Sequence, residues 1–265
     1  MKKIALLLLL VAFPVLGQEN ISAVETGRFF TVADQYVGFD GFGFQYLIKD
    51  NALIKTNGKD RWEYKKVALG KITRVDITNP LMIVLFYEAF NTVVMVDNQL
   101  NEVKTVDFNN LHASIADAVI VRGVGLASQN RLWVYDGLTR QLGLYDYSAA
   151  TFKTISTPLK DEIKYYQTDY NYFQWIDTKG DWYACDVFGK VTTLGNVPAY
   201  ASIRLVSGQS FLYETGGKVL FRDLKNNTTQ TVSGIDNSLK NFYYQAQILA
   251  IFTSSVITNY KINLP

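Results

Sequence analysis

The 265-residue sequence has one cysteine, one histidine and no apolar run long enough to span a membrane, which needs about 20 residues. The lone Cys185 cannot form an internal disulfide, so packing alone must hold the fold, and its apolar neighbours predict a small core residue. A single histidine, His112, cannot assemble a histidine-rich metal site. No D-x-D-x-D-G run offers a calcium loop. We therefore expect neither a metal nor a cofactor.

The first 17 residues have the layout of a secretory signal. Lys2 and Lys3 precede the apolar run 4–11, and Gly17 stands before a polar start. We expect cleavage after Gly17, with an uncleaved anchor as the alternative. No cysteine lies near the cut, so the mature chain is not expected to be a lipoprotein, and it contains no membrane span.

The mature chain carries no excess of either charge. The sequence has 26 basic and 24 acidic residues, and cleavage removes Lys2 and Lys3 but no acid, which leaves 24 of each sign. Nucleic-acid backbones are bound by clustered positive charge, so nucleic acid is not an expected partner.

Short β-prone runs separated by polar turns fill residues 18–265. Each repeat has an apolar strand, a turn and a second apolar strand with a polar end, flanked by further β-prone runs. The centres of the six repeats are residues 44–57, 82–97, 132–146, 173–186, 211–223 and 249–259. Between the polar ends of the third strands the period runs from 36 residues (223 to 259) to 49 (97 to 146). Four-stranded repeats near 40–45 residues are typical of propeller blades.

The two ends of the chain predict how the ring closes. The sixth repeat stops after its third strand, at Pro265, whereas the run Phe29–Ala33 has no repeat of its own. Pairing the N-terminal run with the third strand of the sixth repeat removes exposed sheet edges. We therefore predict one all-β domain over residues 18–265, a closed β-propeller of six four-stranded blades whose last blade is completed by the N-terminal strand. A five-bladed ring and an open two-sheet sandwich remain alternatives.

Acidic and basic residues recur at two positions of the repeat. In a propeller the first strand of each blade lines the channel, and the second-to-third turns share one face with the loops between blades. The second strands end in acids, namely Asp50, Glu88, Asp136, Asp177 and Glu214. The first strands begin near bases, namely Arg74, Lys164, Arg204 and Lys240. Arg122, at the end of the predicted strand 118–122, departs from the pattern.

These residues, with His112 in a loop of the same face, form the candidate binding set. They would make a charged rim that receives a partner or ligand. Alternatively, each acid caps its own turn or pairs with a neighbouring base. We predict no catalytic residues.

Two other groups recur. Polar residues at the ends of the third strands are predicted to stabilise hairpin turns on the opposite face. These are Asp97, Asp146, Asp186, Asp223 and Asn259. Aromatic residues cluster over 165–175 and 242–244, where they either pack between blades or form an exposed patch for protein or glycan.

Four third-strand hairpins share an apolar-x-apolar-x-Asp pattern. They are Val93–Val103, Leu142–Phe152, Trp182–Val191 and Val219–Thr229. This pattern resembles the hairpins of secreted bacterial propellers of the PQQ-like, TolB-like and BamB-like type. The quinoprotein cofactor ligands cannot be placed in this sequence, and the lipobox cysteine of BamB-like scaffolds is missing. The Tyr- and Asn-rich composition resembles an envelope protein of the Bacteroidota.

The resemblance implies a periplasmic or outer-membrane-associated location and a role in outer-membrane protein assembly or secretion. We therefore expect a non-enzymatic scaffold that binds another envelope protein or complex. The alternative is an extracytoplasmic enzyme or sugar-binding propeller that uses the acid-rich rim.

Overall fold

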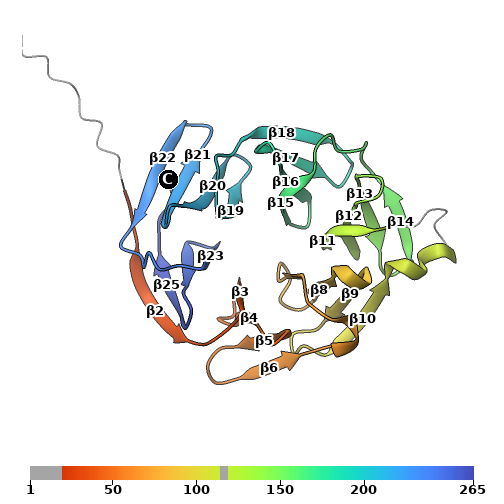
Figure 1. Cartoon of the computed structure of the whole chain (residues 1–265), viewed down its shortest axis with the longest axis horizontal. Coiled ribbons are helices and arrows are strands. Elements are labelled where there is room, and N and C mark those ends of the chain that lie inside the picture. The colour runs from red at the N-terminus through yellow and green to blue at the C-terminus, as the bar shows by residue number, and fades with distance from the viewer. Residues whose placement is uncertain (1–19, 114–118) are drawn as a thin grey trace, which may run out of the picture.

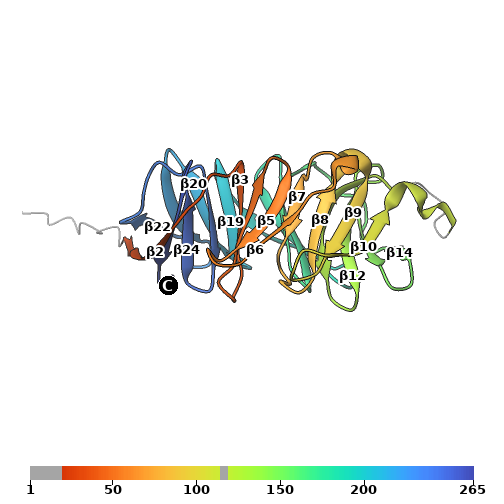
Figure 2. The same cartoon turned by 90° about the horizontal axis from the view of Figure 1, so that it is seen from below.

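The computed structural model describes residues 20–113 and 119–265, without the side chains of 111–113. Six sheets stand around a central axis, each with four antiparallel strands and one with a short fifth strand added in parallel, so the chain is a six-bladed β-propeller (Figure 1). Edge-on, the strands stand upright in a disc (Figure 2). The five-bladed and sandwich alternatives are thereby excluded. The predicted signal, residues 1–17, lies outside the described residues.

Each blade is named by its strands from the channel outward. Blade 1 consists of β3 (Gln35–Phe39), β4 (Gln45–Lys49), β5 (Ala52–Thr56) and β6 (Arg61–Tyr64). Blade 2 consists of β7 (Arg74–Asp76), β8 (Ile83–Tyr87), β9 (Thr92–Val96) and β10 (Glu102–Asp107). Blade 3 consists of β11 (Val121–Ala127), β12 (Arg131–Asp136), β13 (Gln141–Asp146) and β14 (Thr151–Thr154).

The second half of the ring follows the same order. Blade 4 consists of β15 (Ile163–Thr168), β16 (Tyr172–Asp177), β17 (Asp181–Asp186) and β18 (Val191–Asn196). Blade 5 consists of β19 (Ser202–Ser207), β20 (Ser210–Thr215), β21 (Lys218–Asp223) and β22 (Thr228–Ser233). Blade 6 consists of β23 (Asn241–Gln245), β24 (Ile248–Phe252), β25 (Val256–Lys261) and β2 (Val24–Phe30). Three short 3-10 helices are η1 (Val67–Leu69), η2 (Glu88–Phe90) and η3 (Phe108–Ala113).

The middle strands of the blades hold the core. All residues of β8 and β9 are buried, because neighbouring blades cover both faces of the sheet. Side chains of blade 2, such as Phe86 and Met95, pack with Val124 and Leu132 of blade 3. The hydrophobic core is therefore divided among the contacts between blades. Cys185 is fully buried in one of these clusters, as predicted, and burial raises the pKa of its thiol to about 12.

The N-terminal strand closes the ring, which confirms the prediction. β2 pairs antiparallel with β25, from Val24 opposite Lys261 to Phe30 opposite Val256. The strand is longer and earlier than the predicted run Phe29–Ala33, because the backbone of 24–28 also finds partners on β25. A second short strand, β1 (Ile21–Ser22), pairs parallel with the outer strand β22 of blade 5. The N-terminal segment thus spans the last two blades.

No helix in residues 20–113 and 119–265 has the length and apolar character needed to cross a bilayer.

Candidate functional site

Three of the five predicted rim acids are occupied by their own turns. Asp136 and Asp177 are 4% and 2% exposed. Asp136 Oδ1 accepts hydrogen bonds from the backbone N–H of Ile120 and Leu138, each at 3.0 Å. Asp177 Oδ1 likewise accepts from residues 179 and 181, and Glu214 Oε1 accepts from the N–H of residue 217. These carboxylates hold the turns between the second and third strands.

The other two acids are more accessible. Asp50 is exposed, and its backbone N–H donates to Asp34 Oδ2 at 2.7 Å. Glu88 Oε1 lies 2.6 Å from Arg122 Nη1 in an ion pair between blades 2 and 3. Both side chains of the pair are partly solvated, so the pair contributes little to stability and stays accessible to a partner.

The position predicted for Arg122 was wrong. Strand β11 begins at Val121, so Arg122 is the second residue of a first strand and not the last. Arg122 therefore follows the pattern of bases at the start of first strands and faces the acid of the preceding blade.

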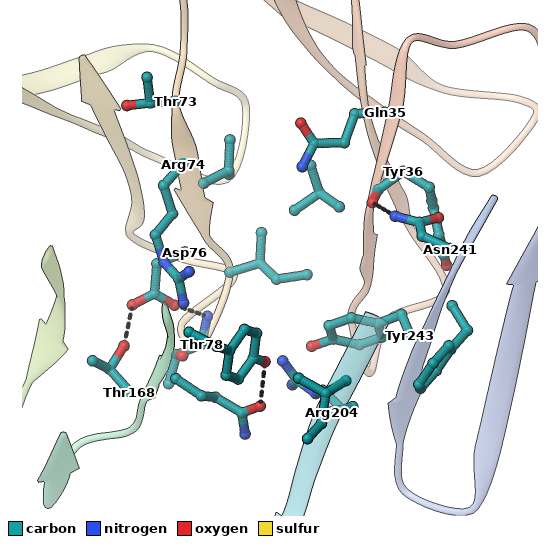
Figure 3. Close-up of a pocket in the computed structure, with 17 residues that line it drawn as sticks. Gln35, Tyr36, Thr73, Arg74, Asp76, Thr78, Thr168, Arg204, Asn241 and Tyr243 are labelled. Atoms are coloured by element: carbon teal, nitrogen blue, oxygen red, sulfur yellow. Dashed lines mark hydrogen bonds between the residues drawn. The ribbon is translucent and has the colours of Figure 1, made fainter. Parts of the chain in front are cut away.

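The predicted bases divide into two groups. Lys164 and Lys240 are exposed, and Lys164 Nζ lies 4.4 Å from the ring centre of Tyr200. Arg74 and Arg204 line the central channel instead of the rim (Figure 3). The backbone of His112 lies in η3, but its side chain is outside the described residues.

The third-strand residues Asp97, Asp146, Asp186 and Asp223 stabilise turns as predicted. Each accepts a hydrogen bond from the backbone N–H two residues on. Asn259 was wrongly placed in this set, because β25 continues to Lys261 and Asn259 pairs with Gly27 inside the sheet. With the four strands of each blade lettered a to d from the channel outward, we call the side of the third-strand turns the c–d face, and the side of the rim acids the b–c face.

The central channel contains a polar cavity of about 230 Å³. Arg74 and Arg204 reach it from β7 and β19, and each guanidinium lies over a tyrosine ring. The Cζ of Arg74 is 3.9 Å from the ring centre of Tyr166, and that of Arg204 is 4.3 Å from Tyr243. Burial raises the pKa of both tyrosines, so these rings are neutral and the stacking is of cation–π type.

The one carboxylate of the cavity, that of Asp76, has its own partners. Asp76 Oδ2 accepts a hydrogen bond from Leu126 N–H at 2.7 Å. It also accepts one from the Thr168 hydroxyl at 3.4 Å, while Oδ1 accepts one from Thr78 N–H at 2.8 Å (Figure 3). Asp76 therefore joins the first strands of blades 2, 3 and 4. Blade 3 can approach this closely because a side chain at Gly125 would collide with Thr168.

Sequence reasoning missed the channel residues other than the two arginines and the clustered aromatic residues. Gln35, Arg74 and Asn241 are each the first residue of a first strand, and all three line the cavity. Comparing that single position across the repeats would have drawn attention to them. In the described part of the chain, no group of three or more His, Cys, Asp or Glu side chains is placed to hold a metal ion.

Five large apolar side chains are exposed on the b–c face, and they follow each other around one half of the ring. Their side chains are 41–77% exposed. They are Val32, Val67, Phe90, Ile120 and Leu138. We call this set the apolar arc. Among the described residues, no comparably exposed large apolar side chain lies on the b–c face of blades 4 and 5.

Hydrogen bonds and a ring contact join the loops that carry the apolar arc over blades 2 and 3. The ring of Phe90 packs over Gly70, in the turn that begins at Val67. The adjacent Asn91 donates from Nδ2 to the backbone oxygen of Val119 at 2.7 Å. The loops that carry the arc are thus fixed relative to one another.

Hydrogen bonds also hold the loops at both ends of the apolar arc. The N–H of Gly137, next to Leu138, donates to the backbone oxygen of Ile120 at 2.7 Å. At the other end, the Asp34–Asp50 bond fixes the loop of Val32 to blade 1.

Part of the aromatic clusters packs between blades, which is one of their two predicted roles. Phe173 and Trp175 are buried and pack between blades 3 and 4. Tyr166 and Tyr243 lie against the arginines of the channel. Tyr170 and Tyr172 are exposed toward the c–d face.

Comparison with known proteins identifies the fold and nothing finer. No protein family matches the sequence, and no curated protein matches it. Virginiamycin B lyase from Staphylococcus aureus superposes with a TM-score of 0.56 and 11% identity over 84% of this chain and 78% of that chain. The WD40 β-propeller domain of Doa1 gives 0.56 and 13% identity over 91% of each chain. Both are propellers.

BamB from Moraxella catarrhalis has 10% identity over 90% of this chain and 99% of that chain, with a TM-score of 0.49. At this score the likeness carries no argument.

Proposed function

We propose that this chain is a non-enzymatic binding propeller of the bacterial envelope that holds a partner protein against its b–c face. A role in outer-membrane protein assembly or in secretion fits this proposal. The observation that supports it is the apolar arc with the Glu88–Arg122 pair beside it. Apolar side chains surrounded by charged groups are characteristic of protein-binding surfaces.

The arc and the pair together define the chemistry of the partner. The loops are held by hydrogen bonds, so the surface is formed before binding and little ordering entropy is lost. Arg122 pairs with Glu88, two residues before Phe90, and lies close to Gly137, next to Leu138. This suits a segment with apolar side chains around an acidic or amide group. A second propeller function, catalysis by the rim acids, is less well supported because Asp136, Asp177 and Glu214 are bonded to backbone N–H groups.

A photo-crosslinking amino acid at Leu138 or Phe90 is expected to give a reproducible protein adduct in intact cells. The matched control is Phe188, which is 89% exposed but lies on the c–d face. The Leu138→Asp variant should weaken capture of the same partner at least about tenfold, since an apolar contact is replaced by a charge. Adducts from position 188 alone, or none from positions 90 and 138, would contradict the proposal.

The envelope location has its own test. Edman sequencing or mass spectrometry of the protein made in its native host is expected to show an N-terminus at Gln18, since Gly17 is the predicted cleavage position. A mature protein that starts at Met1 and stays in the cytoplasmic fraction would refute the location. The crosslinking result would then have to be interpreted for a cytoplasmic partner.

A further inference from the structure

We infer that the central channel binds a small carboxylate that also carries hydroxyl groups, and that Arg74 and Arg204 hold the carboxylate. The residues that carry this inference line the channel and none belongs to the apolar arc, so the inference does not depend on the proposed protein partner. A cavity of about 230 Å³ lined by first strands of five blades admits one small polar molecule. Thr73 and Thr78, which flank β7 at its two ends, are both exposed, so the cavity can be reached from solvent.

The charge of the cavity favours an anion. Among the residues that line it, the charged side chains are Arg74, Arg204 and Asp76, which leaves one net positive charge. The Asp76 carboxylate already accepts two backbone N–H bonds and a hydroxyl, so its accepting atoms are directed at the protein wall. A half-buried positive charge without its own counter-ion favours an anionic ligand.

The guanidinium groups are oriented to bind a carboxylate through their edges. Tyrosine rings cover one flat face of each group, so the remaining bonding capacity lies along the N–H edges. Arg74 Nη2 donates to the backbone oxygen of Tyr166 at 3.1 Å, but its buried Nε has no acceptor among the described residues. Arg204 Nε makes a long bond of 3.4 Å to the backbone oxygen of Tyr244. Edges of this kind match the planar, two-oxygen geometry of a carboxylate.

The amides of the cavity indicate what the rest of the ligand carries. Asn241 donates from Nδ2 to the backbone oxygen of Tyr36 at 2.9 Å, which fixes the amide and leaves its buried Oδ1 without a donor among the described residues (Figure 3). Gln167 also lines the cavity, but its amide is bonded to Leu205 and Tyr165. Gln35 is exposed and lines the cavity, so its amide can pair with a ligand hydroxyl, which a simple aliphatic acid does not carry.

Isothermal titration calorimetry on the mature chain (residues 18–265) tests this with four probes: glucuronate, glucose, acetate and inorganic phosphate. We expect glucuronate to bind at least about tenfold more tightly than glucose, which lacks the carboxylate, and than acetate, which lacks the hydroxyls. Arg74→Gln and Arg204→Gln should each weaken glucuronate binding roughly 10- to 100-fold. Arg204→Lys keeps the charge but loses the planar edge, and should also weaken binding.

The control is Arg61→Gln, which removes an exposed arginine on the outer strand β6 and should leave binding unchanged. Circular dichroism melting shows which variants remain folded, and the Arg204→Lys result decides the matter if a glutamine variant unfolds. Equal binding of glucose, no binding of any probe, or unchanged affinity in the channel variants would overturn the inference. Phosphate binding as tight as glucuronate binding would overturn the carboxylate assignment.

Discussion

Deleting residues 18–30 is expected to prevent stable folding of the protein. The deletion removes β2, which pairs six of its residues with β25, and it withdraws Phe29 from the cluster between blades 6 and 1. Each lost backbone hydrogen bond costs about 1 kcal/mol, so the loss is on the order of 5 kcal/mol. That approaches the total stability of an ordinary domain, roughly 5–15 kcal/mol. The bare edge of β25 would also invite aggregation.

The deletion has a milder counterpart in the same segment. Removing residues 18–22 takes away β1, its two-residue pairing with β22 and the buried side chain of Ile21, and should cost about 3 kcal/mol, less than the longer deletion. A synthetic peptide of residues 20–33 added to the 31–265 fragment should restore the cooperative melting transition. If that fragment melts cooperatively and close to the intact chain without peptide, the pairing of β2 in blade 6 does not hold the ring closed.

Replacing Trp133 by alanine is expected to destabilise the protein severely. Trp133 is fully buried between blades 3 and 4, packs edge-on against Phe173 at 6.2 Å, and donates from Nε1 to the backbone oxygen of Asp169 at 2.8 Å. Trp133→Ala should cost about 3–5 kcal/mol, because the cavity left behind cannot be filled by rigid neighbouring blades. The melting temperature should fall by roughly 10 °C, as measured by calorimetry or circular dichroism.

A matched tryptophan separates packing from hydrogen bonding. Trp182 is equally buried and packs edge-on against Phe211 at 5.8 Å, but its Nε1 has no acceptor among the described residues. Trp133→Phe should therefore cost about 1 kcal/mol more than Trp182→Phe, since only the former strands a carbonyl oxygen. Equal losses in the two phenylalanine variants would mean that the Trp133–Asp169 bond contributes nothing.

The sequence was sufficient for the architecture because each blade repeats the same apolar alternation. It failed at β11, where the predicted strand 118–122 lies mostly before the observed strand Val121–Ala127. The observed strand contains Gly123 and Gly125, which lower its β propensity, and Gly125 is required because Thr168 of β15 approaches so closely. Local propensity therefore favoured the preceding apolar residues. The prediction for Asn259 failed for a related reason, because β25 is extended by its pairing with β2 from the other end of the chain.

The candidate sites were less predictable than the fold. Sequence position placed the rim acids correctly at strand ends, but it could not distinguish a carboxylate that binds its own turn from one that is free. Asp76 illustrates the difficulty, because its partners Leu126 and Thr168 belong to two other blades. Which first-strand side chains meet across the channel depends on the tilt and spacing of the blades, and no local pattern records either.

The N-terminal segment also constrains the order of events during folding. β1 and β2 are the first strands to be synthesised, yet their partners β22 and β25 are among the last. Contacts between such distant parts of a chain form slowly, so the earliest segment must wait while blades 1 to 5 assemble. The rate-limiting step of folding is therefore expected to be the docking of this segment, and the waiting chain is the stage at which a chaperone would have the greatest effect.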